Sequence, residues 1–143
     1  FIFVDTPGIF DASKQFEKAM VNAAWAGIGD ADAALLIVDG TKSISDALTN
    51  IAEGLRKTKK PLFLAINKID KLKKEQLIVL MAEYNRVAKF EGIFMISALK
   101  GSGVDYLKEH LARAMPESPW LYPEDEMTDI PVRMLAAEIT REK

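Results

Sequence analysis

Cysteine is absent from this chain of 143 residues, and histidine occurs once. The chain therefore has no disulfide, no thiolate nucleophile and no Cys-ligated zinc site, which suits a reducing cytoplasm. The formal charge of −2 argues against strong nonspecific attraction to nucleic acid. The longest plain apolar run, residues 33–38, is far too short to cross a bilayer. We expect one main cytoplasmic domain, with no targeting signal in the sequence shown.

Short apolar runs alternate with longer amphipathic segments along the chain. The runs cover residues 1–4, 33–38, 62–66 and 93–96, and each is nearly continuous, as is typical of strands that are covered on both faces. Apolar residues at helical spacing follow Ser45, Lys74 and the Gly-Ser-Gly sequence at 101–103. This alternation predicts an α/β fold, doubly wound around a mostly parallel sheet, with ligands bound outside the carboxyl ends of the strands.

Polar clusters follow three of the four apolar runs. Because the carboxyl ends of parallel strands meet at one edge of a sheet, we expect these clusters to converge on a single rim. The clusters consist of Asp5, Thr6, Pro7 and Gly8 after the first run, Asn67, Lys68 and Asp70 after the third, and Ser97, Ala98, Leu99 and Lys100 after the fourth. The rim is the main functional signal in the sequence.

The sequences DTPG, NKID and SALK at these three places resemble, in this order, the third, fourth and fifth nucleotide motifs of translation-factor-related small GTPases, the TrmE-Era-EngA-like superfamily. Each motif is weak alone, but their order and their placement at strand ends make the combination specific. The resemblance implies a P-loop NTPase-type GTPase domain, with all eleven rim residues in nucleotide binding. It also implies GTP or GDP and Mg²⁺ as cofactors, and leaves room for a monovalent cation such as K⁺.

A carboxylate at position 70 suits recognition of guanine, because guanine offers N1–H and an exocyclic amino group as two hydrogen-bond donors. Adenine would leave Asp70 partly unpaired, and such a mismatch at a buried polar site costs a few kcal/mol. The resemblance further implies that Asn67 holds the base edge and ties neighbouring loops together. It implies that the methylene stem of Lys68 covers the face of the base.

The other two clusters receive their roles from the resemblance alone. The backbone amide of Ala98 is expected to reach the guanine O6, with Ser97 bracing the loop and Lys100 near the base. Asp5 is expected to hold Mg²⁺ through a water, since this ion keeps much of its hydration and prefers oxygen ligands. The amide of Gly8 is expected to sense the terminal phosphate.

The residue after Gly8 is Ile9, where many relatives carry a glutamine that orients the attacking water. Isoleucine has no group that can do this. We therefore expect hydrolysis to be slow or to depend on another group, an ion or a partner, although Ile9 can equally serve to pack under the switch. Loss of the terminal phosphate is expected to release residues 8 to about 28 as the switch region.

A phosphate loop of the form G-x-x-x-x-G-K-[ST] does not occur in the chain. The sequence GTKS at 40–43 does not qualify, because Thr41 separates its glycine from the lysine and Leu35 stands where the first glycine would fall. In the family's sheet, the strand that bears this loop lies between the counterparts of residues 1–4 and 33–38. We therefore expect the chain to be a remnant of a longer protein, in which the remaining strands close the gap or a neighbouring chain fills it.

The carboxyl-terminal part of the sequence narrows the resemblance. Residues 117–127 are polar and contain two prolines, which predicts a linker, and residues 128–143 predict the start of a helix with Pro131 in its first turn. The segments PED and ITREK resemble the Era family of ribosome-assembly GTPases at the junction with an RNA-binding KH domain. This resemblance divides the chain into a partial GTPase domain (1–116), a linker (117–127) and the beginning of a KH domain (128–143).

The Era resemblance implies a protein that hydrolyses GTP to GDP and phosphate and that binds 16S rRNA and the 30S subunit through its KH domain during assembly. It also implies peripheral association with the inner membrane in the parent protein. Two alternatives stay open at this point. The chain can belong to a sister GTPase, such as EngA or the tRNA-modification GTPase, or it can act in this form only as a non-hydrolysing guanine-nucleotide or interaction module.

The missing phosphate loop generates a first test. A fluorescent GTP analogue titrated with Mg²⁺ should bind tightly to a version of the chain that is extended at its amino end, and weakly to the 143 residues alone. Equal binding by the two forms would contradict the expectation that the chain is a remnant.

Overall fold

The computed structural model describes residues 2–4 and 28–119. Within them lies a three-stranded parallel sheet in the order β1-β2-β3. Each strand is followed by a helix, so the predicted alternation is confirmed. The elements are β1 (Ala34–Asp39), α2 (Asp46–Lys57), β2 (Leu62–Asn67), the 3₁₀ turn η1 (Ile69–Lys71), α3 (Lys74–Val87), β3 (Gly92–Met95) and α4 (Val104–Ala114).

Strand β2 is the centre of the sheet and is buried on both faces. Its residues from Leu62 to Ile66 are all at most 4% exposed. Phe63 and Ala65 share one apolar cluster with α4, whereas Leu64 and Ile66 share another with Tyr84 of α3. Because alternate residues of a strand point to opposite faces, a strand with two apolar faces needs a helix on each side.

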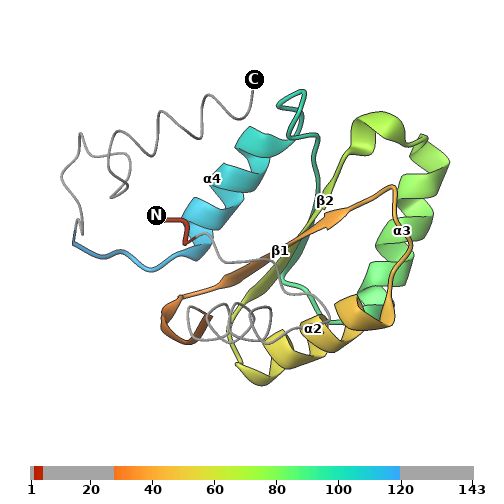
Figure 1. Cartoon of the computed structure of the whole chain (residues 1–143). Coiled ribbons are helices and arrows are strands. Elements are labelled where there is room, and N and C mark those ends of the chain that lie inside the picture. The colour runs from red at the N-terminus through yellow and green to blue at the C-terminus, as the bar shows by residue number, and fades with distance from the viewer. Residues whose placement is uncertain (1, 5–27, 120–143) are drawn as a thin grey trace, which may run out of the picture.

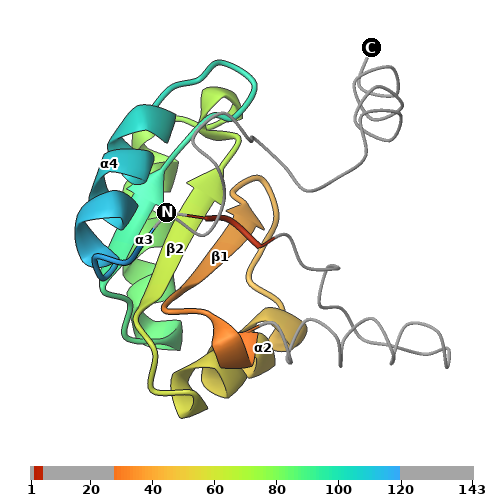
Figure 2. The same ribbon diagram turned by 90° about the vertical axis from the view of Figure 1, so that its left-hand side faces the viewer.

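The helices cover both faces of the sheet. Figure 1 shows α4 on one side of the strands and α2 and α3 on the other, and Figure 2 shows the same arrangement turned by 90°. On the α2 side, Ala52 and Leu55 pack with Leu62 and Ala88 in a third cluster. On the α4 side, the His110 ring lies 5.1 Å from the Phe94 ring, centroid to centroid. The predicted doubly wound fold is therefore present in the described residues.

Local chemistry fixes where two of the helices begin. The side chain of Ser45 accepts a hydrogen bond from the Leu48 amide at 3.2 Å, which caps the first turn of α2. Helix α4 begins after Gly103, whose φ of +75° lies in the left-handed region. A Cβ atom at this position would lie 2.4 Å from the Met95 carbonyl oxygen, so only glycine fits between the loop and β3.

The predicted strand over residues 1–4 is wrong in this structure. Residues 2–4 are described, but they lie outside the sheet, and Ile2, Phe3 and Val4 are each about half exposed or more. A strand is held by ladder hydrogen bonds to a neighbour, and across the described ranges no strand pairs with the edge of β1 that faces away from β2. Residues 2–4 therefore do not close the predicted gap.

Several other predictions fall outside the described residues. They concern Asp5, Thr6, Pro7 and Gly8, the Ile9 replacement, the switch region as far as residue 27, and the linker and KH start from residue 120 onward. Within the parts of the chain that are described, no helix is both long enough and apolar enough to cross a membrane.

The buried centre of β2 generates a stability prediction. Leu64→Ala should lower the free energy of unfolding by about 3 kcal/mol, because Leu64 is fully buried and the substitution leaves a cavity. Ile78→Ala on the exposed face of α3, where the side chain is 69% exposed, should change it by less than about 0.5 kcal/mol. Urea unfolding followed by circular dichroism measures both values. A similar loss in the two variants would mean that β2 is not the centre of the core.

Candidate functional site

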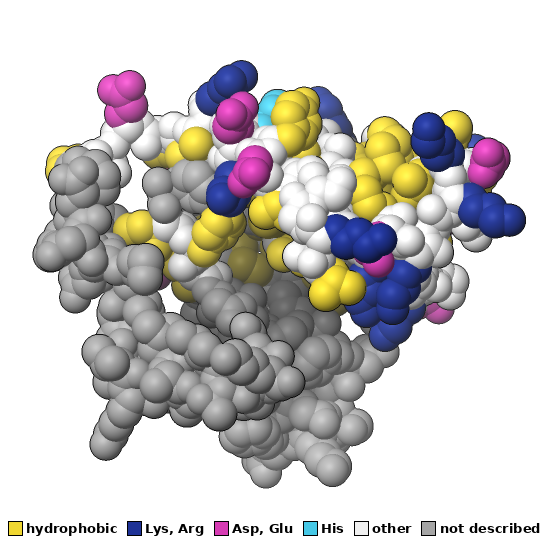
Figure 3. All heavy atoms as spheres, turned by 90° about the horizontal axis from the view of Figure 1, so that it is seen from above, with side chains coloured by type: hydrophobic (Ala, Val, Ile, Leu, Met, Phe, Trp, Pro, Cys, Tyr) yellow, Lys and Arg dark blue, Asp and Glu magenta, His cyan; other side chains and the backbone are white. Residues whose placement is uncertain are grey.

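The strands end together at one edge of the sheet, as the parallel topology requires. Asp39 at the end of β1 is in register with Asn67 at the end of β2, and the loop that follows β3 begins beside them. We call this edge the rim; its described residues are Asp39, Thr41, Asn67, Lys68, Asp70, Ser97, Ala98, Leu99 and Lys100. Seen from above in Figure 3, lysine and arginine side chains with acidic ones between them stand on the described part of this end of the molecule.

Asn67 joins two loops through a single atom. Its side-chain oxygen accepts a hydrogen bond from the Lys68 amide at 2.8 Å and another from the Ala98 amide at 3.0 Å. Lys68 and Ala98 follow different strands, so this oxygen holds the loop after β2 against the loop after β3. These two hydrogen bonds have the geometry that the predicted loop-tying role of Asn67 requires.

Asp70 and Ser97 form a second link between the same two loops. The Ser97 hydroxyl donates to the Asp70 carboxylate at 2.6 Å and accepts from the Lys100 amide at 3.3 Å. Ser97 is 1% exposed, so its side chain is fixed within the protein. The hydrogen bond from Ser97 lowers the pKa of Asp70, and the positive charges of Lys100 and Lys71 lower it further. The carboxylate is therefore ionised at neutral pH and acts only as a hydrogen-bond acceptor.

The loop after β3 turns back on itself within six residues. The Ser97 amide donates to the Ser102 carbonyl at 2.9 Å, which closes an isolated antiparallel bridge. Between these two residues, Ala98, Leu99 and Lys100 are exposed, and Leu99 is 85% exposed. The loop therefore presents its tip to solvent while its base is anchored to β3.

Asp39 is a rim residue that the motifs do not include. Its carboxylate accepts two hydrogen bonds from Thr41, at 3.0 Å from the amide and 2.7 Å from the hydroxyl. Its other oxygen lies 2.7 Å from the ammonium of Lys68. Lys68 first, and then Thr41, hold the pKa of Asp39 well below its ordinary value. The signal in the sequence was its position directly after a predicted strand, the same rule that selected the other clusters.

Of the predicted site residues, those after β2 and β3 come together at the rim. Asp5, Thr6, Pro7 and Gly8, which form the predicted phosphate and magnesium side, lie outside the described residues. Within the described ranges, no group of three or more His, Cys, Asp or Glu side chains is arranged to hold a metal ion.

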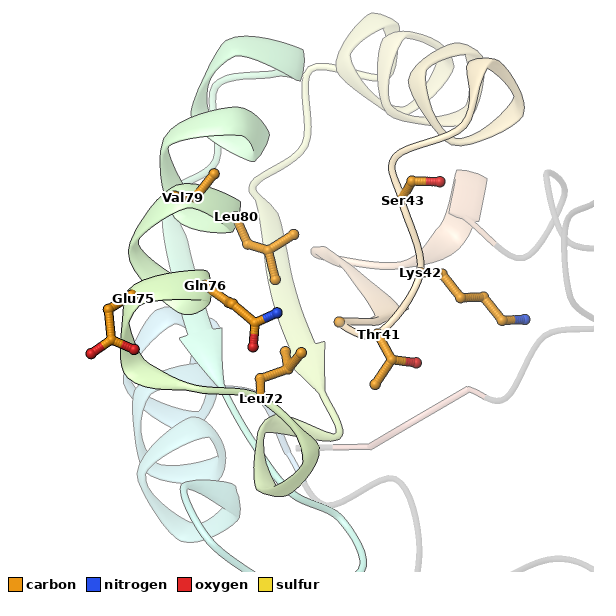
Figure 4. Close-up of a pocket in the computed structure, with 9 residues that line it drawn as sticks. Thr41, Lys42, Ser43, Leu72, Glu75, Gln76, Val79 and Leu80 are labelled. Carbon is orange, nitrogen blue, oxygen red and sulfur yellow. The ribbon is translucent and has the colours of Figure 1, made fainter.

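A cavity of about 440 Å³ lies beside the rim, between the loop after β1 and α3. Figure 4 shows Leu72, Gln76 and Leu80 pointing toward this loop from the α3 side, whereas Glu75 and Lys42 point away. None of the predicted nucleotide-binding residues lines the cavity. Of the predicted base-binding residues, Asn67 and Asp70 are half-buried and Ala98 is exposed, so this part of the rim is open to solvent.

The fold and the rim together define a class of protein. Helices cover both faces of a parallel sheet, and NKID and SALK are joined by hydrogen bonds at its carboxyl end; this arrangement is typical of a P-loop GTPase domain. A comparison with protein families agrees, since the family described as the Elongation factor Tu GTP binding domain matches residues 1–117. The chain belongs to this family of GTP-binding domains.

Curated relatives support the Era resemblance. Over 99% of its own length, the chain is 47% identical to GTPase Era of Sinorhizobium medicae. It is also 47% identical to GTPase Era of Mesorhizobium japonicum, again over 99% of its own length. It covers 46% of each of these proteins, so it spans about half the length of the curated relatives it matches. The prediction of an Era-type GTPase domain is confirmed at this level.

Solved structures agree with the sequence comparison. The chain is similar to a crystal structure of Era in complex with MgGDPNP and nucleotides 1506–1542 of 16S ribosomal RNA, with a TM-score of 0.85 and 36% identity. That likeness covers 96% of this chain and 47% of the other. Translation elongation factor SelB from Methanococcus maripaludis, in its apo form, gives a TM-score of 0.66 over 86% of this chain and 26% of that one. At 21% identity, this second likeness shows the fold alone.

The Ser97 hydrogen bond generates a prediction about pH. Because the native pKa of Asp70 lies below its ordinary value, Asp70 stabilises the fold above about pH 4, and this contribution is lost as the pH falls through the native pKa. Ser97→Ala should raise the native pKa of Asp70 toward its ordinary value, so the stability of the variant should fall less steeply in this acid range. Carbon-13 NMR titration of the Asp70 carboxyl measures the shift directly.

Ser102→Ala is the matched control, because Ser102 joins the same loop through its backbone carbonyl. It should leave the titration of Asp70 as it is in the wild type. An unchanged Asp70 titration in Ser97→Ala would refute the assigned cause.

Proposed function

We propose that this chain supplies the guanine-recognising half of an Era-type GTPase. The intact enzyme binds GTP with Mg²⁺, hydrolyses it to GDP and phosphate, and binds 16S rRNA during assembly of the small ribosomal subunit. One observation carries the proposal: Asn67 and Ser97 hold the loops after β2 and β3 together with the Asp70 carboxylate between them. This arrangement presents an ionised acceptor beside a backbone amide, the pair of groups that the edge of guanine requires.

In this proposal, Asp70 accepts the two guanine donors and the Ala98 amide serves the guanine O6. In the structure, the single N–H of Ala98 donates to Asn67 at 3.0 Å, so nucleotide binding requires this N–H to exchange Asn67 for O6 or to share its hydrogen between the two acceptors. Leu99 and Lys100 lie on the exposed tip of the same loop and border the base. The carboxylate supplies most of the discrimination, because an adenine ring would leave it partly unpaired.

The phosphate side of the proposal rests on the sequence and on the relatives. Asp5 would hold Mg²⁺ through a water and Gly8 would contact the terminal phosphate, with Thr6 and Pro7 shaping the turn between them. Magnesium is usually held by one or two carboxylates together with substrate phosphates, so a single Asp is enough on the protein side. The Era structure to which the chain is similar holds MgGDPNP, which supports this pairing. We extend the proposal to a monovalent cation such as K⁺ at the same place.

The RNA and ribosome functions belong to the whole protein. The similar Era structure holds a segment of 16S ribosomal RNA, which supports binding of that RNA and of the 30S subunit. We propose the division into a GTPase domain (1–116), a linker (117–127) and the start of a KH domain (128–143), which would carry RNA binding. We also propose a cytoplasmic location with peripheral association at the inner membrane.

Asp70→Asn tests the proposed guanine recognition. In the full-length protein, this change should shift the preference from guanine toward xanthine nucleotides. The asparagine amide can donate a hydrogen bond to the xanthine oxygen that replaces the guanine amino group. We expect guanine affinity to fall roughly a hundredfold, as for the loss of hydrogen bonds to a charged acceptor. Competition of GDP and XDP against a fluorescent GDP analogue measures the preference.

Asp105→Asn makes the same chemical change on α4, where the carboxylate is 91% exposed, and should leave the preference for guanine intact. An Asp70→Asn variant that still prefers GDP to XDP to the same degree as the wild type would refute the role of Asp70.

A further inference from the structure

We propose that Asp39 is a positioning residue for nucleotide binding: it anchors the ammonium of Lys68 so that the methylene stem of Lys68 is held as a fixed wall for the guanine ring. The inference rests on the proposed function, since it concerns the same rim. It adds a residue from the end of β1 to a base site that is otherwise built from the loops after β2 and β3.

The Lys68 side chain is held at both of its ends. Its backbone amide donates to the Asn67 side chain at 2.8 Å, at the end of β2. Its ammonium lies 2.7 Å from the Asp39 carboxylate, at the end of β1. The stem between these two anchors therefore spans the ends of two neighbouring strands, whereas an unanchored lysine side chain would sample many rotamers.

The backbone at Lys68 contributes to this direction. Its φ of +67° and ψ of +32° lie in the left-handed region, which is uncommon for a residue with a side chain. Such a conformation costs energy and persists where the surrounding structure enforces it. Here the two hydrogen bonds to Asn67 and Asp39 fix the residue at both ends.

Hydrogen bonds from Thr41 hold the Asp39 carboxylate in place independently of Lys68. Thr41 gives one of its oxygens two hydrogen bonds, at 3.0 and 2.7 Å, which leaves the other oxygen directed at the ammonium. The carboxylate is the less exposed partner, with a side chain 19% exposed against 46% for Lys68. The more rigid group is therefore the acid, and the lysine is the group that is positioned.

Gly40 brings this acid within reach of β2. Its amide donates to the Asn67 carbonyl at 2.9 Å, so the chain after β1 stays against the central strand. A Cβ atom at position 40 would lie 2.8 Å from Ile66 Cγ2 and 2.9 Å from Leu72 Cδ1. The absence of a side chain allows the close approach that sets the spacing between Asp39 and Lys68.

The ion pair also determines which part of Lys68 acts on the ligand. Because Asp39 neutralises the ammonium, Lys68 contributes an apolar surface to the base more than a free positive charge. Removing Asp39 would free the stem and reduce affinity for guanine nucleotides without removing any group that touches the base.

A double-mutant cycle in the full-length protein tests this inference. Asp39→Asn and Lys68→Met keep the sizes of the two side chains, and the methionine keeps most of the stem. Each single change should raise the Kd for a fluorescent GDP analogue roughly fivefold. The double variant should be no more than about twofold weaker than either single variant, because both changes remove one shared interaction.

Asp105→Asn and Lys108→Met form the matched control cycle. This pair is also an ion pair, at 3.2 Å, but it lies on α4 with both side chains more than half exposed. All three control variants should bind the analogue as the wild type does. Thermal unfolding of every variant accompanies the binding measurements, because a purely structural role of Asp39 would lower the melting temperature and would not couple to position 68 in the Kd.

The outcomes separate this inference from the proposed function. Binding losses that add up in the double variant, or Asp39→Asn with an unchanged Kd, would overturn the positioning role while guanine binding stands. A wild-type protein that does not bind the GDP analogue would overturn the proposed function and this inference with it. Non-additive losses in the Kd, with none in the control pair, would establish the positioning role.

Discussion

The rim depends on the two hydrogen bonds that the Asn67 side-chain oxygen accepts. One comes from the loop after β2 and the other from the loop after β3. Beyond the ends of the strands, a backbone hydrogen bond from the Ile69 amide to the Ile96 carbonyl joins these loops at 3.2 Å, and the Asn67 side chain adds a second connection. The Ser97 to Asp70 hydrogen bond is a further connection between the same two loops. Together they make one surface from two segments that are about thirty residues apart.

Strand β2 gives this surface its rigidity. Asn67 is its last residue, and the five residues before it are almost completely inaccessible to water. Helices press on both faces, so the strand cannot shift without disturbing two apolar clusters at once. Polar groups at the end of such a strand are therefore held in a fixed position. In this fold class, ligand sites lie at the carboxyl edge of the sheet, where these groups stand.

Much of this arrangement could be predicted from the sequence. The apolar runs located β1, β2 and β3 to within one residue, because a strand buried on both faces leaves a continuous apolar signature. The meeting of Asn67, Asp70 and Ala98 followed from parallel topology alone. Residues 2–4 lie outside the sheet although they belong to an apolar run, because a strand needs ladder hydrogen bonds to a neighbouring strand and composition does not encode that pairing. Asp39 directly follows the predicted strand over residues 33–38, so its place at the rim could have been predicted by the same rule. Its contact with Lys68, 29 positions away, could not, because no local pattern encodes that pairing.

The left-handed backbone at Lys68 limits which residues this position can accept. Asparagine or glycine would relax the backbone there, yet neither has a chain long enough to reach across to the end of β1. A longer side chain has the reach but must bear the conformational strain. Two requirements therefore conflict at position 68: the left-handed backbone favours a small residue, whereas the contact with Asp39 requires a long side chain. Lysine makes the contact and keeps a strained backbone conformation.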